Sequence, residues 1–233
     1  MRSLFEAKHD EQEESHWLSV ADLMAGLMMV FLFVAIALMM DAFIERDKIK
    51  QVAVAYQENQ MAIYEALHEE FKGDLERWNA EIDEDTLTVT FKSPKVLFKT
   101  GEINLSDKYK LLLFDFFPRY MDVLAPYHDS INEVRIEGHT SSVWNQYVSN
   151  TIAYFNNMEL SQGRTRSVLE FVFGMERTVK YQGWIKSHVA AVGLSSSKPM
   201  LKNNGKEDRA KSRRVSFRVI TNADIQIKRI LQG

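Results

Sequence analysis

The 233-residue sequence predicts an α/β (α+β) fold, in which a membrane helix and a helical stalk precede a sheet covered by helices on one face. Three observations predict it. Residues 23–40 carry no charged side chain, residues 41–82 repeat apolar positions at helical spacing, and strand-like and helix-like segments alternate after residue 85. We expect a tail at 1–16, a transmembrane helix at 17–40, a stalk at 41–82, a folded domain at 83–222 and a second tail at 223–233.

The uncharged run is long enough to cross a membrane. A helix from Trp17 to Met40 would extend roughly 36 Å at about 1.5 Å per residue, which exceeds the hydrocarbon core of a bilayer. The run is too long for the apolar part of a signal peptide, and no small-residue cleavage site follows it. We therefore expect a retained anchor.

Asp22 lies at the mouth of this helix. A carboxylate there costs several kcal/mol unless it is paired, hydrated or protonated. One interpretation is a helix-start residue at the lipid headgroups. The other is an ion-binding carboxylate that faces a partner helix, with Ser19 as a nearby hydroxyl.

The stalk is predicted to be an amphipathic helix, because its apolar residues recur in steps of three and four. Such a stripe needs a partner: a second copy of the helix in a homodimer is the default, and the chain's own domain is the alternative. The apolar positions are Ile49, Val52, Tyr56, Ile63, Leu67, Phe71, Leu75, Trp78 and Ile82.

The remaining segments predict the folded domain. Strands are expected at 87–91, 134–137, 189–192 and 215–219. Helices are expected at 106–124, with a kink or break at Pro118, and at 159–173, started near Asn156 and Asn157.

Composition excludes several kinds of chemistry. The sequence has no cysteine, so disulfides, thiolate metal sites and thiol nucleophiles are impossible. The formal net charge of −3 argues against nucleic acid as a direct partner. Since no catalytic triad, metal-ligand cluster or phosphate loop stands out, we expect no enzymatic activity and no cofactor. His139 is expected to be a structural hydrogen-bonding residue.

Three motifs in the second half resemble the OmpA-like peptidoglycan-binding domain. They are Ile136-Glu-Gly-His-Thr140, Asn157-Met-Glu-Leu-Ser-Gln-Gly-Arg164-Thr-Arg-Ser-Val168 and Arg213-Arg-Val215, and Leu97-Phe-Lys-Thr-Gly101 is similar to the family's first loop. The resemblance covers about residues 85–221. It implies a mixed sheet with helices on one face.

The same resemblance implies the binding residues. Arg164 would pair with a carboxylate of the peptidoglycan stem peptide, Asn157 would open the binding helix and Leu160 would pack beneath the site. Arg213 and Arg214 would either support the site or simply lie at the edge of the sheet. The family's aspartate, which receives the ligand's ammonium group, is Ser141 here. Binding is therefore expected to be weaker, or the ammonium to be met by another residue such as Glu137. The insertion at 143–155 could rebuild the pocket or form a dimer surface.

The first half resembles the membrane helix of the flagellar stator B subunit through Trp17-Leu-Ser-Val-Ala-Asp22-Leu-Met-Ala. The whole chain is similar to the B component of the Zorya anti-phage defence system, because it is short and leads quickly from span to domain. That resemblance implies a homodimer inside a pentameric ring of A subunits, a translocated proton or sodium ion carried by Asp22, and cytosolic defence effectors reached indirectly. A flagellar-type or other envelope stator and a plain wall-binding anchor are the alternatives.

The resemblance also implies an inner-membrane location, with residues 1–16 in the cytoplasm and the domain in the periplasm. The charges near the span favour the opposite orientation. Arg2 and Lys8 precede the span among five acidic residues, whereas Arg46, Lys48 and Lys50 follow it.

Overall fold

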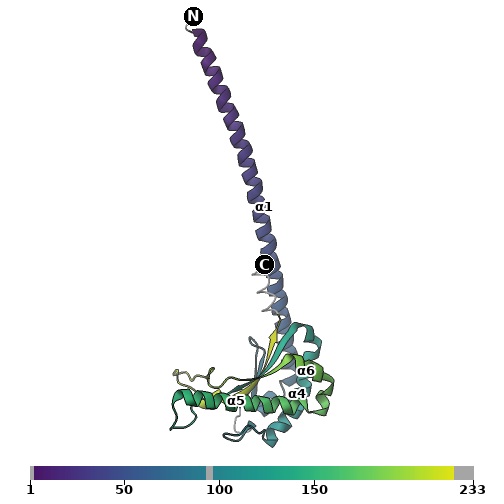
Figure 1. Cartoon of the computed structure of the whole chain (residues 1–233). Helices are drawn as coiled ribbons and strands as arrows, with labels where there is room; N and C mark the ends of the chain where they lie inside the picture. The colour runs from purple at the N-terminus through teal and green to yellow at the C-terminus, as the bar shows by residue number, and fades with distance from the viewer. Residues whose placement is uncertain (1–2, 93–96, 223–233) are drawn as a thin grey trace. The chain divides into compact units, whose positions relative to one another are not determined.

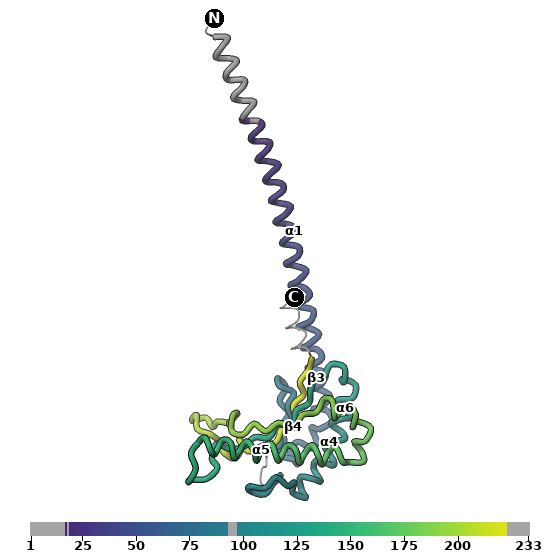
Figure 2. The backbone as a smooth tube through the Cα atoms, viewed as in Figure 1, coloured from purple at the N-terminus to yellow at the C-terminus, as the bar shows by residue number. Residues whose placement is uncertain are grey.

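The computed structural model describes residues 3–92 and 97–222, with the side chains described at Trp17 and from Ser19 onward. Its contacts divide the chain into two units, residues 1–53 and 54–233. Helix α1 (Ser3–Phe71) belongs to both units (Figures 1 and 2).

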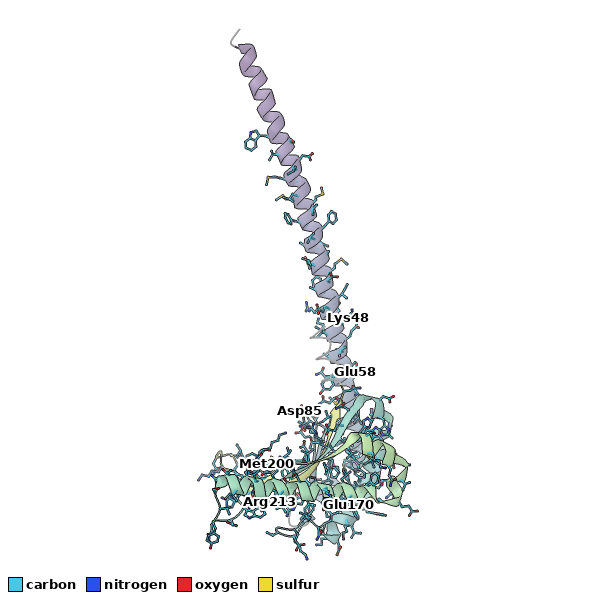
Figure 3. The ribbon with its side chains drawn as sticks, in the orientation of Figure 1. Lys48, Glu58, Asp85, Glu170, Met200 and Arg213 are labelled. Atoms are coloured by element: carbon cyan, nitrogen blue, oxygen red, sulfur yellow. The ribbon has the colours of Figure 1, made fainter. Side chains whose placement is uncertain are left out.

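The first unit consists of the N-terminal part of α1. Its described apolar side chains from Trp17 to Ile44 project from the helix in several directions (Figure 3) and are exposed. Within the part of the chain that the structure describes, this is the single helix long and apolar enough to cross a membrane. Asp22 and Ser19 are exposed on it. The limits 17–40 for the span itself stay a prediction.

The second unit is built on a five-stranded mixed sheet with the order β1-β2-β5-β3-β4. Strands β3 and β4 are parallel, and the other neighbouring pairs are antiparallel. The predicted α+β fold is confirmed. The strands are β1 (Ala80–Asp83), β2 (Thr88–Phe91), β3 (Ile131–His139), β4 (Val189–Gly193) and β5 (Arg214–Thr221).

Helices cover one face of this sheet (Figure 1), with α5 against β3 and β4. The longer helices are α4 (Asp107–Leu124) and α5 (Asn150–Phe173). The shorter ones are α2 (Leu75–Trp78), α6 (Gln182–His188), α7 (Arg209–Ser212) and the 3-10 helices η1 (Ala125–Ser130) and η2 (Glu176–Tyr181).

The hydrophobic core lies between the sheet and these helices. Phe217 of β5 is at its centre, with ring centroids 5.1 Å from Phe116 and 5.9 Å from Tyr120 of α4. Alternation along β5 places Val215, Phe217 and Val219 on this face, as expected for a half-buried strand.

The end of α1 is part of this core. Ile63, Leu67 and Phe71 follow one another at four-residue steps and are fully buried. Polar ties add to the packing: Gln60 Nε2 donates to the carbonyls of Glu84 and Asp85 at 3.1 and 2.7 Å. The stripe of this part of the stalk is thus covered by the chain's own domain, the alternative to a dimer partner.

Three local predictions are corrected: the end of the stalk helix, a break at Pro118 and the start of α5. The helical spacing up to Ile82 does not continue one helix, because α1 ends at Phe71 and the left-handed Asn79 (φ 48°) turns the chain into β1. Helix α4 continues through Pro118 without a break. Proline leaves the carbonyl four residues earlier without its helical donor, and Arg177 Nη1 donates to that carbonyl, of Phe114, at 3.5 Å.

The third correction concerns α5, which begins at Asn150 rather than near Asn156 and Asn157. Ser149 is its N-cap, and its hydroxyl accepts a hydrogen bond from the Ile152 N–H at 3.3 Å. Asn157 is therefore inside the helix, two turns from its start, and its side chain is buried.

Candidate functional site

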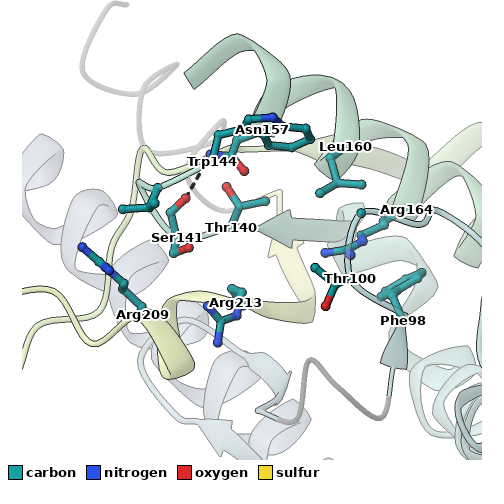
Figure 4. A pocket seen from close by; sticks show the side chains of 12 residues that line it. Phe98, Thr100, Thr140, Ser141, Trp144, Asn157, Leu160, Arg164, Arg209 and Arg213 are labelled. Atoms are coloured by element: carbon teal, nitrogen blue, oxygen red, sulfur yellow. Dashed lines mark hydrogen bonds between the residues drawn. The ribbon is translucent and has the colours of Figure 1, made fainter. Parts of the chain in front are cut away.

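A cavity of about 410 Å³ lies at the end of the sheet, between α5, α7 and two loops (Figure 4). It brings together Ser141, Asn157, Leu160, Arg164 and Arg213, the residues that the sequence singled out in the domain. Their role as ligand contacts stays a prediction. The remaining lining residues are Phe98, Thr100, Gly101, Thr140, Val143, Trp144 and Arg209.

Two glycines bring α5 close to the sheet at this end. Gly138 of β3 and Gly193 of β4 are register partners. A Cβ atom on Gly138 would meet the Ser161 carbonyl oxygen at 2.8 Å, and one on Gly193 would overlap the backbone of Gln162. The absence of both side chains allows the close approach that sets the height of α5 above the strands.

Arg164 forms one wall of the cavity. Its Nε donates to the Glu102 carbonyl at 2.9 Å and its Nη2 to the Lys99 carbonyl at 3.1 Å. The guanidinium also lies 4.8 Å from the centroid of the Phe98 ring. Its hydrogen bonds therefore hold the turn at Gly101 (φ +77°), which confirms that 97–101 is a loop beside the site.

The charge of Arg164 is not balanced by a carboxylate among the described residues. Burial, and after it the positive charge of Arg213, lower the pKa of the Arg164 guanidinium to about 10. It therefore remains a cation at neutral pH. A partly buried cation bonded only to carbonyl oxygens is chemically suited to accept an anion.

Asn157 positions the opposite wall. Its side chain is 3% exposed, and Nδ2 donates to the Ser141 carbonyl at 3.1 Å (Figure 4). Its amide nitrogen is thereby used inside the protein. The next residue, Ser142, donates from its backbone N–H and its hydroxyl to the two carboxylate oxygens of Glu207 at 3.0 and 2.6 Å. Two elements distant in sequence thus fix the loop that follows β3.

Glu137 and His139 lie outside the cavity lining. Both are buried, and His139 Nε2 is 3.5 Å from Glu137 Oε2. Burial lowers the pKa of His139, so the imidazole is neutral at pH 7. The suggestion that Glu137 meets a ligand ammonium group is not supported, because its carboxylate is used by His139.

Sequence reasoning did not single out Arg209, and it left the role of Trp144 open. Arg209 lies in α7, outside every motif, and Trp144 lies in the insertion, which does contribute to the pocket. The Arg-rich stretch at 209–214 was the available signal. Within residues 3–92 and 97–222, no cluster of three His, Asp or Glu side chains could hold a metal ion.

The fold can now be compared with those of known proteins. No family model matches the sequence. Among solved structures, the chain is similar to a putative MotB-like protein from Desulfovibrio vulgaris, with a TM-score of 0.50 and 24% identity over 70% of this chain and 91% of the other. The two proteins therefore share an α+β fold, which in this chain follows an apolar helix of membrane-spanning length.

The sequence comparison is more specific. The chain is 56% identical over 222 residues to the Zorya protein ZorB of Escherichia coli, covering 95% of this chain and 94% of that protein. At this identity and coverage, the chain belongs to the ZorB family. The resemblance inferred from its motifs is confirmed at the level of the family.

Proposed function

We propose that this protein is the wall-anchored, ion-conducting B subunit of a rotary inner-membrane motor in anti-phage defence. The observation that carries the proposal is the cavity with Arg164 at its wall, a cation without a carboxylate partner among the described residues. The family membership supplies the defence context. The role is one of anchoring and transport, without enzymatic turnover or a bound cofactor.

The anchor would work through anion recognition. A planar guanidinium can bind a carboxylate through two parallel hydrogen bonds, which an ammonium group cannot do. Arg164 already donates Nε and Nη2 to its own loop, so its remaining N–H groups and those of Arg213 would receive a stem-peptide carboxylate. Leu160 and Trp144 would contact the apolar part of the peptide. Asn157 and Ser141 would define the opposite wall.

The motor function would depend on Asp22. A protonated carboxyl group is neutral and can pass an apolar wall that its charged form cannot pass. Each elementary charge moved through the membrane potential delivers about 2.3 kcal/mol per 100 mV. Two copies of the helix would stand inside a pentameric ring of A subunits, and Asp22 would carry the proton, or a sodium ion, between half-channels.

Two variants separate these parts. Asp22→Asn should abolish phage protection while retaining binding to purified peptidoglycan sacculi, because it removes only the ionisable group. Arg164→Ala should abolish both protection and sacculus binding. Asp41→Asn, a second exposed aspartate of α1, is the control for the first variant.

The measurements are plaque counts on cells expressing the protein with its partner subunits, and co-sedimentation with sacculi, both at matched membrane levels. Full protection by the Asp22→Asn variant would favour a plain wall-binding anchor, which is the alternative function. Full sacculus binding by the Arg164→Ala variant would reject this cavity as the anchor site.

A further inference from the structure

The cavity is lined by three arginines and, among its described residues, by no acidic side chain. Figure 4 shows Arg164 and Arg213 on either side of Thr100, with Arg209 beyond Arg213. Neither Arg209 nor Arg213 forms an ion pair within the described part of the chain. The positive charge of Arg213 also reaches Arg164, since it contributes to the lowered pKa of that guanidinium.

The two acidic side chains next to Arg209 in the chain are directed elsewhere. Asp208 caps α7, and its Oδ1 accepts hydrogen bonds from the Ala210 and Lys211 N–H groups at 3.1 and 3.2 Å. Both carboxylate oxygens of Glu207 accept hydrogen bonds from Ser142. Ser141, whose side chain lines the cavity, has a neutral hydroxyl. A ligand ammonium group entering this space would meet three cations and no carboxylate among the described lining residues, and like charges repel at such distances.

We infer that the pocket recognises its ligand through carboxylate groups alone and does not require a free amino group on it. The inference rests on the proposed function, because it takes the ligand to be a peptidoglycan stem peptide. A cross-link converts a side-chain amine of one stem peptide into a neutral amide and leaves carboxylates in place. The protein would therefore bind cross-linked stem peptides as well as free ones, and could anchor to mature wall.

The test uses the full-length protein in detergent micelles and three synthetic stem peptides. One peptide carries a free side-chain amine, the second carries the same amine acetylated, and the third has its carboxylates converted to amides. We expect the first two to bind with affinities within about threefold of each other, and the third to bind at least about tenfold more weakly, since charge-assisted hydrogen bonds are lost.

Two kinds of variant sharpen the result. Arg209→Ala and Arg213→Ala should each lower the affinity for the free peptide and the affinity for the acetylated peptide by the same factor. Ser141→Asp should create a preference of about tenfold or more for the free amine, because it places a carboxylate in the lining. Because Ser141 is only 5% exposed, the thermal unfolding of the Ser141→Asp variant is measured first to check that it folds. The comparison of peptides on the wild-type protein does not depend on this variant.

A wild-type preference of about tenfold or more for the free amine would overturn the inference and point to an unoccupied carboxylate at the site. Equal binding of the amidated peptide would overturn it as well. Co-sedimentation with sacculi, measured in parallel, tests the proposed function separately. Sacculus binding without binding of any peptide overturns the inference alone, whereas loss of sacculus binding by the wild type overturns both.

Discussion

In the proposed function, Arg164 has two tasks that use the same guanidinium: it holds a loop of its own domain and binds the ligand. Its Nε and Nη2 hold the carbonyls of Glu102 and Lys99, and Phe98 lies against its plane at 4.8 Å. These contacts fix the planar guanidinium group in one orientation before any ligand binds. A side chain that is already ordered loses less conformational entropy on binding.

This arrangement predicts that charge alone is insufficient at position 164. Arg164→Lys keeps the positive charge but has one nitrogen, so it cannot hold both carbonyls and also present a planar fork. We expect sacculus binding to fall by at least about tenfold, as when a charge-assisted pair is lost. Co-sedimentation of the full-length protein measures it.

The matched control is Arg166→Lys on the same helix, where the side chain is exposed. Binding by this variant should equal that of the wild type. Wild-type binding by the Arg164→Lys variant would mean that the guanidinium serves the loop rather than the ligand.

At the scale of elements, the domain depends on two close approaches: α5 to the sheet beside the cavity, and the end of α1 to α4. The first is made by the glycine pair of β3 and β4. The second is made by Arg119 of α4, whose Nε lies 2.6 Å from Glu70 Oε1 and whose Nη1 lies 2.8 Å from Asp74 Oδ2. Each approach gives a prediction.

Gly193→Ala should displace α5, because the added methyl group would overlap the backbone of Gln162. We expect a loss of stability of about 1–3 kcal/mol, typical of overpacking, together with weaker sacculus binding. Thermal unfolding and co-sedimentation measure the two effects. Gly183→Ala in α6 is the control, since a Cβ there meets nothing within 4 Å. Unchanged binding by the Gly193→Ala variant would show that the pocket tolerates a shift of its main helix.

Arg119→Ala should destabilise the domain by roughly 1–3 kcal/mol, because the partly buried Asp74 loses one of its two arginine partners and the exposed Glu70 loses its own. Chemical denaturation of the full-length protein measures the change. Lys110→Ala on the same helix breaks only an exposed pair at 3.4 Å and should leave stability unchanged. Equal effects of the two variants would contradict a clamp between α4 and the end of α1.

The same elements show what could be read from the sequence. Strands β2 to β5 were predicted within a few residues, because alternating apolar residues face one side of a sheet. Strand β1 was not predicted. Leu75 and Trp78 of α2 and Ile82 of β1 all face the same core, so their spacing in the sequence resembles that of one helix. The start of α5 was misplaced because the family motif begins at Asn157, whereas Ser149 caps the helix two turns earlier.

The candidate site was predicted in part for a similar reason. The site residues on α5 and at the end of β3 could be predicted, because they lie in short motifs whose spacing matches that of the OmpA-like family. The contacts of Arg164 with main-chain carbonyls and of Glu207 with Ser142 join positions 62 to 65 residues apart. Such pairs depend on how loops close, which no local pattern specifies.

At the scale of the whole molecule, the proposed function requires the domain to reach the cell wall. A periplasm-active reporter fused after Gly233 should therefore be active, and the same reporter fused before Met1 should be inactive. Enzyme activity of the two fusions in intact cells measures the orientation. Activity of a cytoplasm-active reporter after Gly233 would contradict anchoring to peptidoglycan. An active reporter after Gly233 would also show that the orientation is opposite to the one favoured by the weak charge bias around the span.

The glycine pair beneath α5 has a genetic consequence. Gly138 and Gly193 touch no ligand, yet any side chain at either position moves the helix that carries Leu160 and Arg164. A selection for mutants that lose wall attachment but still fold should recover these two codons together with those of the cavity. Smaller side chains at 161 and 162 should not restore binding, because the added Cβ atoms would meet main-chain atoms of these two residues. The binding site therefore requires two glycine codons, although neither glycine lines the cavity.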